Sequence, residues 1–379
     1  MAKYKLSDIA PIRQGAVPDE FPCWLLNLDM VESNTGRIIK YLYVQSDEIG
    51  ASTVAFDTSN VLYSKLRPYL NKVVLPDRPG FATSEMLPLM PNTAIITREY
   101  LTYFLRSPRF VGYINEKTSG AKMPRANTAD LKTAEIDCPS IEQQTSIVGM
   151  LERVTHIIEL RQRQLRAFDT LIKARFIEMF GDQEQFESAP LDNSVEEMFI
   201  GPFGSSLKNE CFVPPDQGFC IVYEQKHAIR KTMDVETRYV DEHKYKELQR
   251  FTVRGGDIIV SCRGTIGETF IVPDDAPMGI MHPSIMKIRL KSERYDRVFF
   301  DHLLQSILKQ HEAEANGSGV KMAITATALG QEMFIIPPLS VQRQFAAFVS
   351  QVDKSKVVIQ AALDKAQTLF DSLMQKYFG

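Results

Sequence analysis

Two stretches of the sequence decide the fold: PSIEQQTSIV at residues 139–148 and PPLSVQRQFA at residues 337–346. They align without a gap at an offset of 198. Each opens a segment of some forty residues that keeps this offset as far as Phe180-Gly181 and Phe378-Gly379. A self-similarity of this kind indicates that the chain contains two copies of one unit.

The repeat continues upstream at an offset of 199. It pairs Ser107 with Ser306, Gly120 with Gly319, and Lys122-Met123 with Lys321-Met322. Farther back the similarity fades, although Ser64 and Ser261 stand in comparable strand-like contexts. A period near 200 residues is too long for a solenoid and indicates a domain duplication. The copies agree in the segments after Pro139 and Pro337 and diverge in the parts before them.

Both agreeing segments have the heptad spacing of a coiled coil, with apolar residues in alternating steps of three and four. The predicted seam residues are Leu151, Val154, Ile158, Leu165, Phe168 and Ile172 in the first helix, and Val349, Val352, Ile359, Leu363, Phe370 and Leu373 in the second. From Ile141 to Phe180 is 40 residues, which makes a helix of about 60 Å at 1.5 Å per residue. Arg161 and Arg175 interrupt the first seam.

Two arrangements of these helices are open: each packs on its own globular part, or the two pack on each other. The seam is too long for the face of one small domain, which favours mutual packing. Because the intervening part must bring the chain back, an antiparallel pair is expected. Such a pair would hold two globular domains at opposite ends of a rod, with pseudo-two-fold symmetry.

The globular parts are predicted to be mixed, β-rich α/β (α+β) domains. The expected organisation is a first domain at 1–138, a long helix at 139–181, a second domain at 182–336 and a second long helix at 337–379. Runs rich in β-branched and aromatic residues, separated by turn residues, predict the strands. The predicted strands are 24–28, 37–44, 60–63 and 72–75, then 257–261, 269–272 and 285–290; helices are predicted at 98–105 and 297–310.

Composition sets broad bounds. The chain is 44% apolar and 24% charged, as expected of a soluble globular protein. It has no apolar run long enough to span a bilayer, and its start lacks the apolar core of a signal peptide, so a cytoplasmic location is expected. Five cysteines without a Cys-x-x-Cys pair argue against disulfides and a zinc site. The net charge of −3 does not by itself indicate nucleic-acid binding.

Sequence motifs of catalysis are missing. There is no phosphate-binding Gly-x-x-x-x-Gly-Lys-Ser/Thr loop, no dinucleotide fingerprint, no Gly-x-Ser-x-Gly elbow and no His-Glu-x-x-His pair. The stretches Gly201-Pro202-Phe203-Gly204 and Gly255-Gly256 are interpreted as simple turns. Together these observations favour a binding protein, without metal or cofactor, over an enzyme.

Basic and polar strings beside predicted strands are the best candidates for function. A Ser-Gly-x-Lys-Met string precedes each long helix, and small residues followed by Lys suit a backbone approaching phosphate. A solvated turn with a surface Lys is the plain alternative, but recurrence in both copies favours a functional role. The candidate DNA-binding residues are Ser64, Lys65, Arg67, Tyr69, Lys72, Lys122, Arg125, Lys226, His227, Arg230, Lys231, Ser261, Arg263 and Lys321.

The chain resembles the specificity (S) subunit of type I restriction-modification systems. The resemblance rests on the paired Pro-x-x-x-x-Gln segments with their helices, and on NVLYSKLRPY at 60–69 and GDIIVSCRGTIG at 256–267. It covers essentially the whole chain. No single motif is highly specific; the order and the duplication carry the resemblance.

The resemblance implies that each globular part is a target recognition domain reading one half of a split site in double-stranded DNA. It also implies that the helices form an antiparallel spacer docking two methyltransferase subunits, which restriction/translocase subunits join. The S subunit itself would be non-catalytic and would bind neither S-adenosylmethionine nor ATP. Arg161 and Arg175 would either pair with acids on the partner helix or reach DNA.

Three rivals stay open: the recognition subunit of another bipartite-site system, a self-sufficient DNA-modifying enzyme, and a coiled-coil scaffold without nucleic acid. Under the favoured interpretation the two half-sites should differ, because the two globular sequences differ. A helix of about 60 Å is shorter than two turns of DNA at roughly 34 Å each. We therefore predict half-sites about one turn apart.

Overall fold

The computed structural model describes residues 2–118, 120, 122–263, 265–318 and 325–379, with the side chains of 313–318 left out. Two compact units emerge. Unit 1 comprises Met1–Gln164 and Ile359–Gly379, and unit 2 comprises Leu165–Val358. Each contains sheets, short helices and a segment of both long helices, which confirms the mixed, duplicated α+β class.

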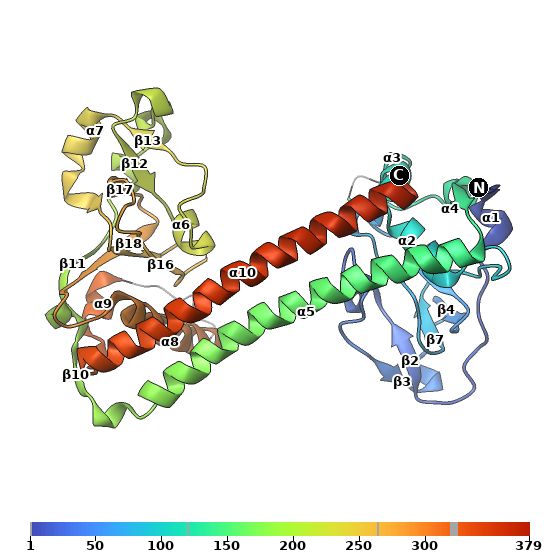
Figure 1. Cartoon of the computed structure of the whole chain (residues 1–379), viewed down its shortest axis with the longest axis horizontal. Helices are drawn as coiled ribbons and strands as arrows, with labels where there is room; N and C mark the ends of the chain where they lie inside the picture. The colour runs from blue at the N-terminus through green and yellow to red at the C-terminus, as the bar shows by residue number, and fades with distance from the viewer. Residues whose placement is uncertain (1, 119, 121, 264, 319–324) are drawn as a thin grey trace. The chain divides into compact units, whose positions relative to one another are not determined.

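The two repeated segments form the long helices α5, Ile141–Phe180, and α10, Leu339–Phe378 (Figure 1). Ser140 and Gln143 begin α5 with a reciprocal pair: each main-chain N–H donates to the other's side-chain oxygen, at 3.3 Å. This satisfies donors that the first turn of a helix leaves unpaired. The helix ends at Phe180, and the N–H of the next residue, Gly181, still donates to the carbonyl of Ile177 at 2.8 Å.

The helices run antiparallel in both units. In unit 1, Leu151 near the start of α5 shares a buried core with Met374 and Phe378 near the end of α10. In unit 2 the pairing is reversed, with Phe176 near the end of α5 lying 5.4 Å, ring to ring, from Phe345 near the start of α10. The predicted mutual packing therefore describes the helices better than separate packing on the two globular parts.

All the predicted seam residues are buried or half-buried, as an interhelical face requires. The two arginines of the first seam bind polar side chains of their own helix. The Arg161 guanidinium donates to Gln164 at 2.8 Å, and that of Arg175 pairs with Glu178 at 2.8 Å while lying over the Phe348 ring of α10. The acid partner of Arg175 is thus intrahelical, and its interhelical contact is with an aromatic ring.

The globular part of unit 1 contains two small sheets, followed by helices that cover them. The first sheet has the order β3-β2-β7-β4 and the second β6-β5-β8. Their bounds are β2 Cys23–Leu26, β3 Tyr43–Val44, β4 Thr53–Phe56, β5 Val61–Ser64, β6 Val73–Val74, β7 Gly80–Thr83 and β8 Met86–Leu89. A third pair joins β1, Ala2–Lys5, to β9, Glu135–Cys138; the α-helices are α1 Leu6–Ile9, α2 Arg98–Arg106, α3 Pro108–Glu116 and α4 Thr128–Thr133.

Unit 2 repeats this plan with one strand more. Its sheets have the orders β13-β12-β17-β14 and β11-β18-β15-β16. Their bounds are β11 Val195–Ile200, β12 Cys220–Tyr223, β13 Tyr239–Val240, β14 Thr252–Val253, β15 Ile258–Ser261, β16 Thr269–Ile271, β17 Gly279–Met281 and β18 Ile285–Leu290. The pair β10, Glu187–Pro190, with β19, Met333–Ile336, matches β1 with β9; the α-helices are α6 Gln225–Arg230, α7 Glu242–Glu247, α8 Arg297–Ser318 and α9 Ala326–Gln331.

The first sheets of the two units have the same topology. In each, two central strands run parallel, β2 with β7 and β12 with β17, and each is flanked by an antiparallel neighbour. The same glycine recurs. A Cβ on Gly80 would lie 2.5 Å from the carbonyl oxygen of Trp24, and one on Gly279 would lie 2.4 Å from that of Ile221. The globular parts, which diverge in sequence, therefore keep the same strand pairing in these first sheets.

One predicted strand is much shorter than expected. Of residues 37–44, only Tyr43–Val44 pair as a strand, and Ile38 makes an isolated bridge to Val31. Ile39 and Tyr41 are exposed. The β-branched and aromatic residues that suggested a strand thus lie next to the edge strand β3 and make only single main-chain bonds, such as that from the N–H of Ile39 to the carbonyl of Met30 at 2.9 Å, instead of a continuous ladder.

Candidate nucleic-acid interface

The predicted basic residues of unit 1, apart from Lys72, gather at one edge of its sheets. Because β2 and β7 are parallel, their carboxyl ends meet at the same edge. The second sheet joins there, since the N–H of Lys65, just after β5, donates to the carbonyl of Glu85 in the β7–β8 turn at 2.9 Å. Lys65 is half-buried at this position.

Main-chain pairing brings a second basic string to the same place. The N–H of Arg67 donates to the carbonyl of Pro124, and the N–H of Ala126 donates to the carbonyl of Lys65, both at 2.8 Å. Two strings separated by about sixty positions in the sequence therefore lie side by side. The Arg125 guanidinium pairs with Glu85 at 3.1 Å, while Arg67 is exposed with a left-handed backbone.

We call this group edge 1: Lys65, Arg67, Glu85, Lys122 and Arg125. Lys122 belongs to it as an exposed residue two positions before Pro124. Its cations outnumber its single acid, which suits a phosphate-bearing ligand.

Three other candidates of unit 1 have different surroundings. Ser64 is buried, and its hydroxyl donates to the carbonyl of Leu66 at 3.0 Å, so it shapes the turn. The Lys72 ammonium is half-buried and donates to the carbonyl of Leu28 at 2.7 Å; burial lowers its pKa. Tyr69 is exposed on the short 3-10 turn Pro68–Leu70, with its ring open to solvent.

The equivalent edge of unit 2 carries a different set of side chains. Glu224 follows β12 and His282 follows the parallel strand β17, so both stand at the carboxyl end of that sheet. The second sheet joins in the same way as in unit 1, through the N–H of Cys262, which donates to the carbonyl of Ser284 at 2.8 Å. The next residue, Arg263, is exposed.

Glu224 organises this edge. Its carboxylate forms ion pairs with the ammonium of Lys226 at 2.8 Å and with the guanidinium of Arg238, which also lies 3.9 Å from the centre of the Phe212 ring. Burial alone would raise the pKa of Glu224, but these two cations hold it below its usual value. We call Glu224, Lys226, Arg238, Arg263 and His282 edge 2.

Two predicted residues of unit 2 are fully buried. The Nδ1 atom of His227 accepts from the N–H of Glu224 at 3.1 Å, and burial lowers the pKa of this imidazole. The Ser261 hydroxyl accepts from the N–H of Glu268 at 3.0 Å. Side chains without exposed surface cannot touch DNA in this conformation, so we assign both, like Ser64, to shaping the edges.

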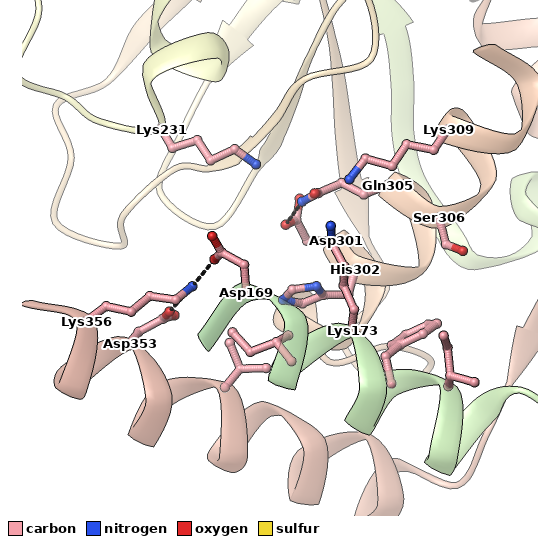
Figure 2. Close-up of a pocket in the computed structure, with 14 residues that line it drawn as sticks. Asp169, Lys173, Lys231, Asp301, His302, Gln305, Ser306, Lys309, Asp353 and Lys356 are labelled. Carbon is pink, nitrogen blue, oxygen red and sulfur yellow. Dashed lines mark hydrogen bonds and ion pairs between the residues drawn. The ribbon is translucent and has the colours of Figure 1, made fainter. Parts of the chain in front are cut away.

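Two predicted cations of unit 2, Arg230 and Lys231, lie at the C-terminal end of α6. Arg230 is exposed, whereas Lys231 pairs with Glu268 at 3.8 Å and reaches a cavity of about 640 Å³. Figure 2 shows this cavity between Lys231 and the helices of unit 2, where the Lys356 ammonium binds Asp169 of α5 at 2.8 Å. At the position equivalent to its His302, unit 1 has Tyr103, packed on Phe370, so the copies also differ here. Lys321 lies outside the described residues.

Sequence reasoning missed the acids and two of the basic groups of these edges: Glu85, Glu224, Arg238 and His282. A usable signal was present for two of them. Polar residues directly after buried parallel strands meet at one edge, and Glu224 and His282 follow such strands. Arg238 had no local signal, because only the β12–β13 pairing brings it to Glu224.

A family model called "Type I restriction modification DNA specificity domain" matches residues 1–167 and 224–366, which is most of the chain. The chain belongs to this family. The two matched segments correspond to the two copies of the duplication. The resemblance inferred from the paired helices is thus confirmed.

Two curated relatives of this specificity-domain protein are specificity subunits. The type I restriction enzyme EcoDI specificity subunit of Escherichia coli is 27% identical over 135 residues, which are 36% of this chain and 30% of that relative. The chain thus matches less than a third of that relative's length. The type I restriction enzyme MjaIX specificity subunit of Methanocaldococcus jannaschii is 20% identical over 402 residues, covering 98% of this chain and 91% of the relative.

A solved structure shares the fold. It is described as "Structural basis underlying complex assembly and conformational transition of the type I R-M system" and superposes with a TM-score of 0.63 at 16% identity, covering 100% of this chain and 97% of its own. Within the described part of this family member, no helix is long and apolar enough to cross a membrane. The same part holds no group of three or more His, Cys, Asp or Glu side chains suited to a metal ion.

Proposed function

We propose that the chain is the sequence-reading subunit of a type I restriction-modification enzyme, and that edge 1 and edge 2 each read one half of a bipartite DNA site. One observation carries this: the same backbone edge occurs in both copies but presents different side chains. A framework that repeats while its exposed residues change is what two different half-sites require.

Exposed cations are proposed to supply most of the affinity through phosphates, and edge side chains to supply the sequence preference. Lys122→Ala should weaken binding to every sequence alike and reduce the salt dependence by about one phosphate contact. Arg67→Ala and Arg263→Ala should instead relax the preference within one half-site each. Lys246→Ala, an exposed lysine of α7, is the matched control and should change neither property.

The long helices are proposed to dock two methyltransferase subunits, which restriction/translocase subunits join. Several large apolar side chains on them are exposed and would be covered by such partners: Ile157, Leu160, Leu171, Ile177, Val357, Val358 and Leu369. Isolated exposed apolar residues are common, but a run of them along a helix pair suits a protein interface. In this proposal the chain contributes no catalytic group. Because it acts on DNA with its partner subunits, it is proposed to be cytoplasmic.

Methylation-site mapping of DNA exposed to the assembled complex tests the proposal directly. We expect an asymmetric site with two different halves about one turn apart and an unread spacer. Exchanging residues 1–138 for another recognition domain should change one half only. A palindromic site, or a change in both halves after the exchange, would contradict the assignment of one half to each edge.

The rival of a self-sufficient DNA-modifying enzyme is tested with the purified chain alone. Incubated with DNA and either Mg²⁺ or a methyl donor, it should neither cut nor methylate. Activity of the chain alone would overturn the non-catalytic assignment. A chain that binds no DNA, alone or assembled, would instead favour a scaffold.

A further inference from the structure

The Gly201-Pro202-Phe203-Gly204 turn has a feature that the proposed function has not used. The Phe203 side chain is 87% exposed, more than the other large apolar side chains described as exposed. Gly204 and Ser205 share this exposure, whereas Pro202 before the ring is buried and Leu207 is 4% exposed. An aromatic ring therefore stands in water at the tip of a turn whose two flanks are packed into the domain.

The turn is fixed to edge 2. The N–H of Gly201 donates to the carbonyl of Ile285 at the start of β18, at 2.9 Å. A Cβ on Gly201 would lie 2.3 Å from the carbonyl oxygen of His282, so only glycine allows this approach. Phe203 therefore comes two residues after a backbone contact with His282, at the carboxyl end of β17.

A hydrogen bond also holds the backbone that follows Phe203. The N–H of Ser206 donates to the carbonyl of Phe203 at 2.8 Å and closes a 3-10 turn over Gly204–Ser206. A Cβ on Gly204 would meet nothing within 4 Å, so the space beside the ring is open. A side chain presented on a fixed backbone loses less conformational freedom on binding than one on a mobile loop.

Unit 1 lacks this device. The strand β11, which delivers the turn, lies at the edge of the sheet β11-β18-β15-β16, whereas the corresponding sheet of unit 1 is β6-β5-β8. Among the described residues of unit 1, Ile12 makes only an isolated bridge to Leu89, on the strand equivalent to β18. An aromatic ring on this turn thus belongs to the second copy, whereas unit 1 exposes Val17, five positions after Ile12, and has its own exposed ring, Tyr69, two positions after Arg67 of edge 1.

We propose that Phe203 inserts as a wedge at a base step of the half-site read by edge 2, and stacks on a partly unstacked base. This rests on the proposed DNA-binding function. A DNA base offers an apolar face inside a polyanion, which suits an exposed aromatic ring on a turn joined to edge 2, the group that contains the cations Lys226 and Arg263. Apolar side chains of this kind are known to open base steps, and aromatic stacking on bases tolerates different sequences.

The wedge would contribute to specificity without a hydrogen bond to any base edge. Steps differ in how easily they unstack, and pyrimidine–purine steps open most readily. The second half-site should therefore prefer such a step at the position of the ring.

The experiment uses duplexes with 2-aminopurine placed in turn at each position of the second half-site. They are bound by the chain assembled with its methyltransferase subunits. For the natural chain we expect fluorescence to rise severalfold at one position or two adjacent ones. Phe203→Ala should abolish the rise and weaken binding by about tenfold to a hundredfold, as loss of one base stack does. Phe203→Trp should keep the signal.

Phe219→Ala is the matched control, an aromatic side chain 48% exposed in the same domain, just before β12 and therefore at the opposite end of that strand. It should leave fluorescence and affinity unchanged. Because the Phe203 ring is exposed, Phe203→Ala should unfold at the same temperature as the natural chain, which separates a binding defect from misfolding.

The outcomes separate this inference from the proposed function. A natural complex without sequence-specific binding would overturn both. If the natural complex binds and Phe203→Ala binds and unstacks equally well, only the wedge is overturned. If Phe203→Ala alters assembly with the methyltransferase subunits and leaves DNA binding intact, the ring is a protein contact and the wedge is again overturned.

Discussion

Replacing Gln144 or Gln342 should destabilise the copy that contains it, by nearly the same amount in each. Both side chains are fully buried at the second turn of their long helix. The Gln144 amide donates to the carbonyls of Ile95 and Pro139 at 2.8 and 2.9 Å and accepts from the N–H of Thr97 at 2.9 Å.

Gln342 makes the same three bonds in unit 2. It donates to the carbonyls of Arg294 and Pro337 at 3.1 and 2.7 Å, and accepts from the N–H of Asp296 at 2.8 Å. Thr97 and Asp296 begin α2 and α8 by capping their first turns. Each glutamine therefore joins the start of a domain helix to the start of a long helix.

The magnitude follows from the three bonds. A hydrogen bond within a protein contributes about 0.5–1.5 kcal/mol net, and a buried donor left unpaired costs about 1–3 kcal/mol. Truncation to alanine deletes all three bonds and strands a buried N–H, so we expect a loss of about 2–5 kcal/mol. For a domain of this size that lowers the melting temperature by about 5–15 °C.

Calorimetry would give the global loss, and hydrogen exchange at the Thr97 and Asp296 amides would locate it. Gln144→Ala should expose the first amide and Gln342→Ala the second. Gln344→Ala, an exposed neighbour, should change stability by less than about 0.5 kcal/mol. The reasoning is refuted if both variants unfold like the natural chain, or if the Thr97 amide of Gln144→Ala stays fully protected.

Three further predictions concern the framework. Gly80→Ala and Gly279→Ala place a Cβ against a carbonyl oxygen, so each should lower the free energy of unfolding by about 1–3 kcal/mol. In Gly149→Ala, on α5, the new Cβ meets no other atom and the free energy of unfolding should rise by about 0.5–1 kcal/mol. Urea titration measures both changes. Lys287→Ala removes a buried cation bound to Glu197 at 2.5 Å and to the carbonyl of Thr252 at 2.8 Å. Glu197 keeps Arg289 as a partner at 3.0 Å, so the expected cost is about 1–3 kcal/mol, that of leaving the buried carbonyl unpaired. Exposed Lys246→Ala is the neutral comparison in thermal melts. Burial lowers the pKa of His227, His282 and His302 below the ordinary 6.5, so the stability that their neutral forms contribute is present above that pH and is lost as the pH falls below about 6.5. His227→Gln should flatten the pH dependence of the melting temperature, and exposed His243→Gln should leave it unchanged.

The long helices could be predicted from the sequence because their pattern is local. A heptad spacing needs only neighbouring turns of one helix, and duplication showed it twice. The Pro-x-x-x-x-Gln motif was also visible in the sequence, but the structural role of its glutamine was not. Gln144 bonds to residues nearly fifty positions away, and no spacing rule within the helix reports such a partner.

The likeness of the two globular parts could not be seen in the sequence. Their strands are two to six residues long, too short for a clear alternation of apolar and polar positions. What the copies share is main-chain pairing, which constrains few side chains apart from glycines such as Gly80 and Gly279. Apolar residues can replace one another at the other positions while the topology stays the same.

The candidate site was predicted in part. Residue type and recurrence pointed to cations such as Lys65 and Arg125, and main-chain bonds bring these two to one edge. Their acid partners could not be predicted, because Glu85 and Glu224 meet the cations only through sheet pairing. Nor could burial be predicted: His227 and Ser261 looked like surface polar residues and are enclosed.

The division between constant and variable groups has a physical consequence for how recognition can change. The groups that the copies share satisfy the backbone: Gln144 and Gln342 bind main-chain atoms, and Gly80 and Gly279 admit a neighbouring carbonyl. The groups that differ, such as Arg67 in one edge and Arg263 in the other, are exposed and support no core. Substituting an exposed edge residue costs little stability, usually within about 0.5 kcal/mol. One framework can therefore carry many pairs of half-site preferences, and a whole edge with its turn, such as the one bearing Phe203, can be gained by one copy without disturbing the other.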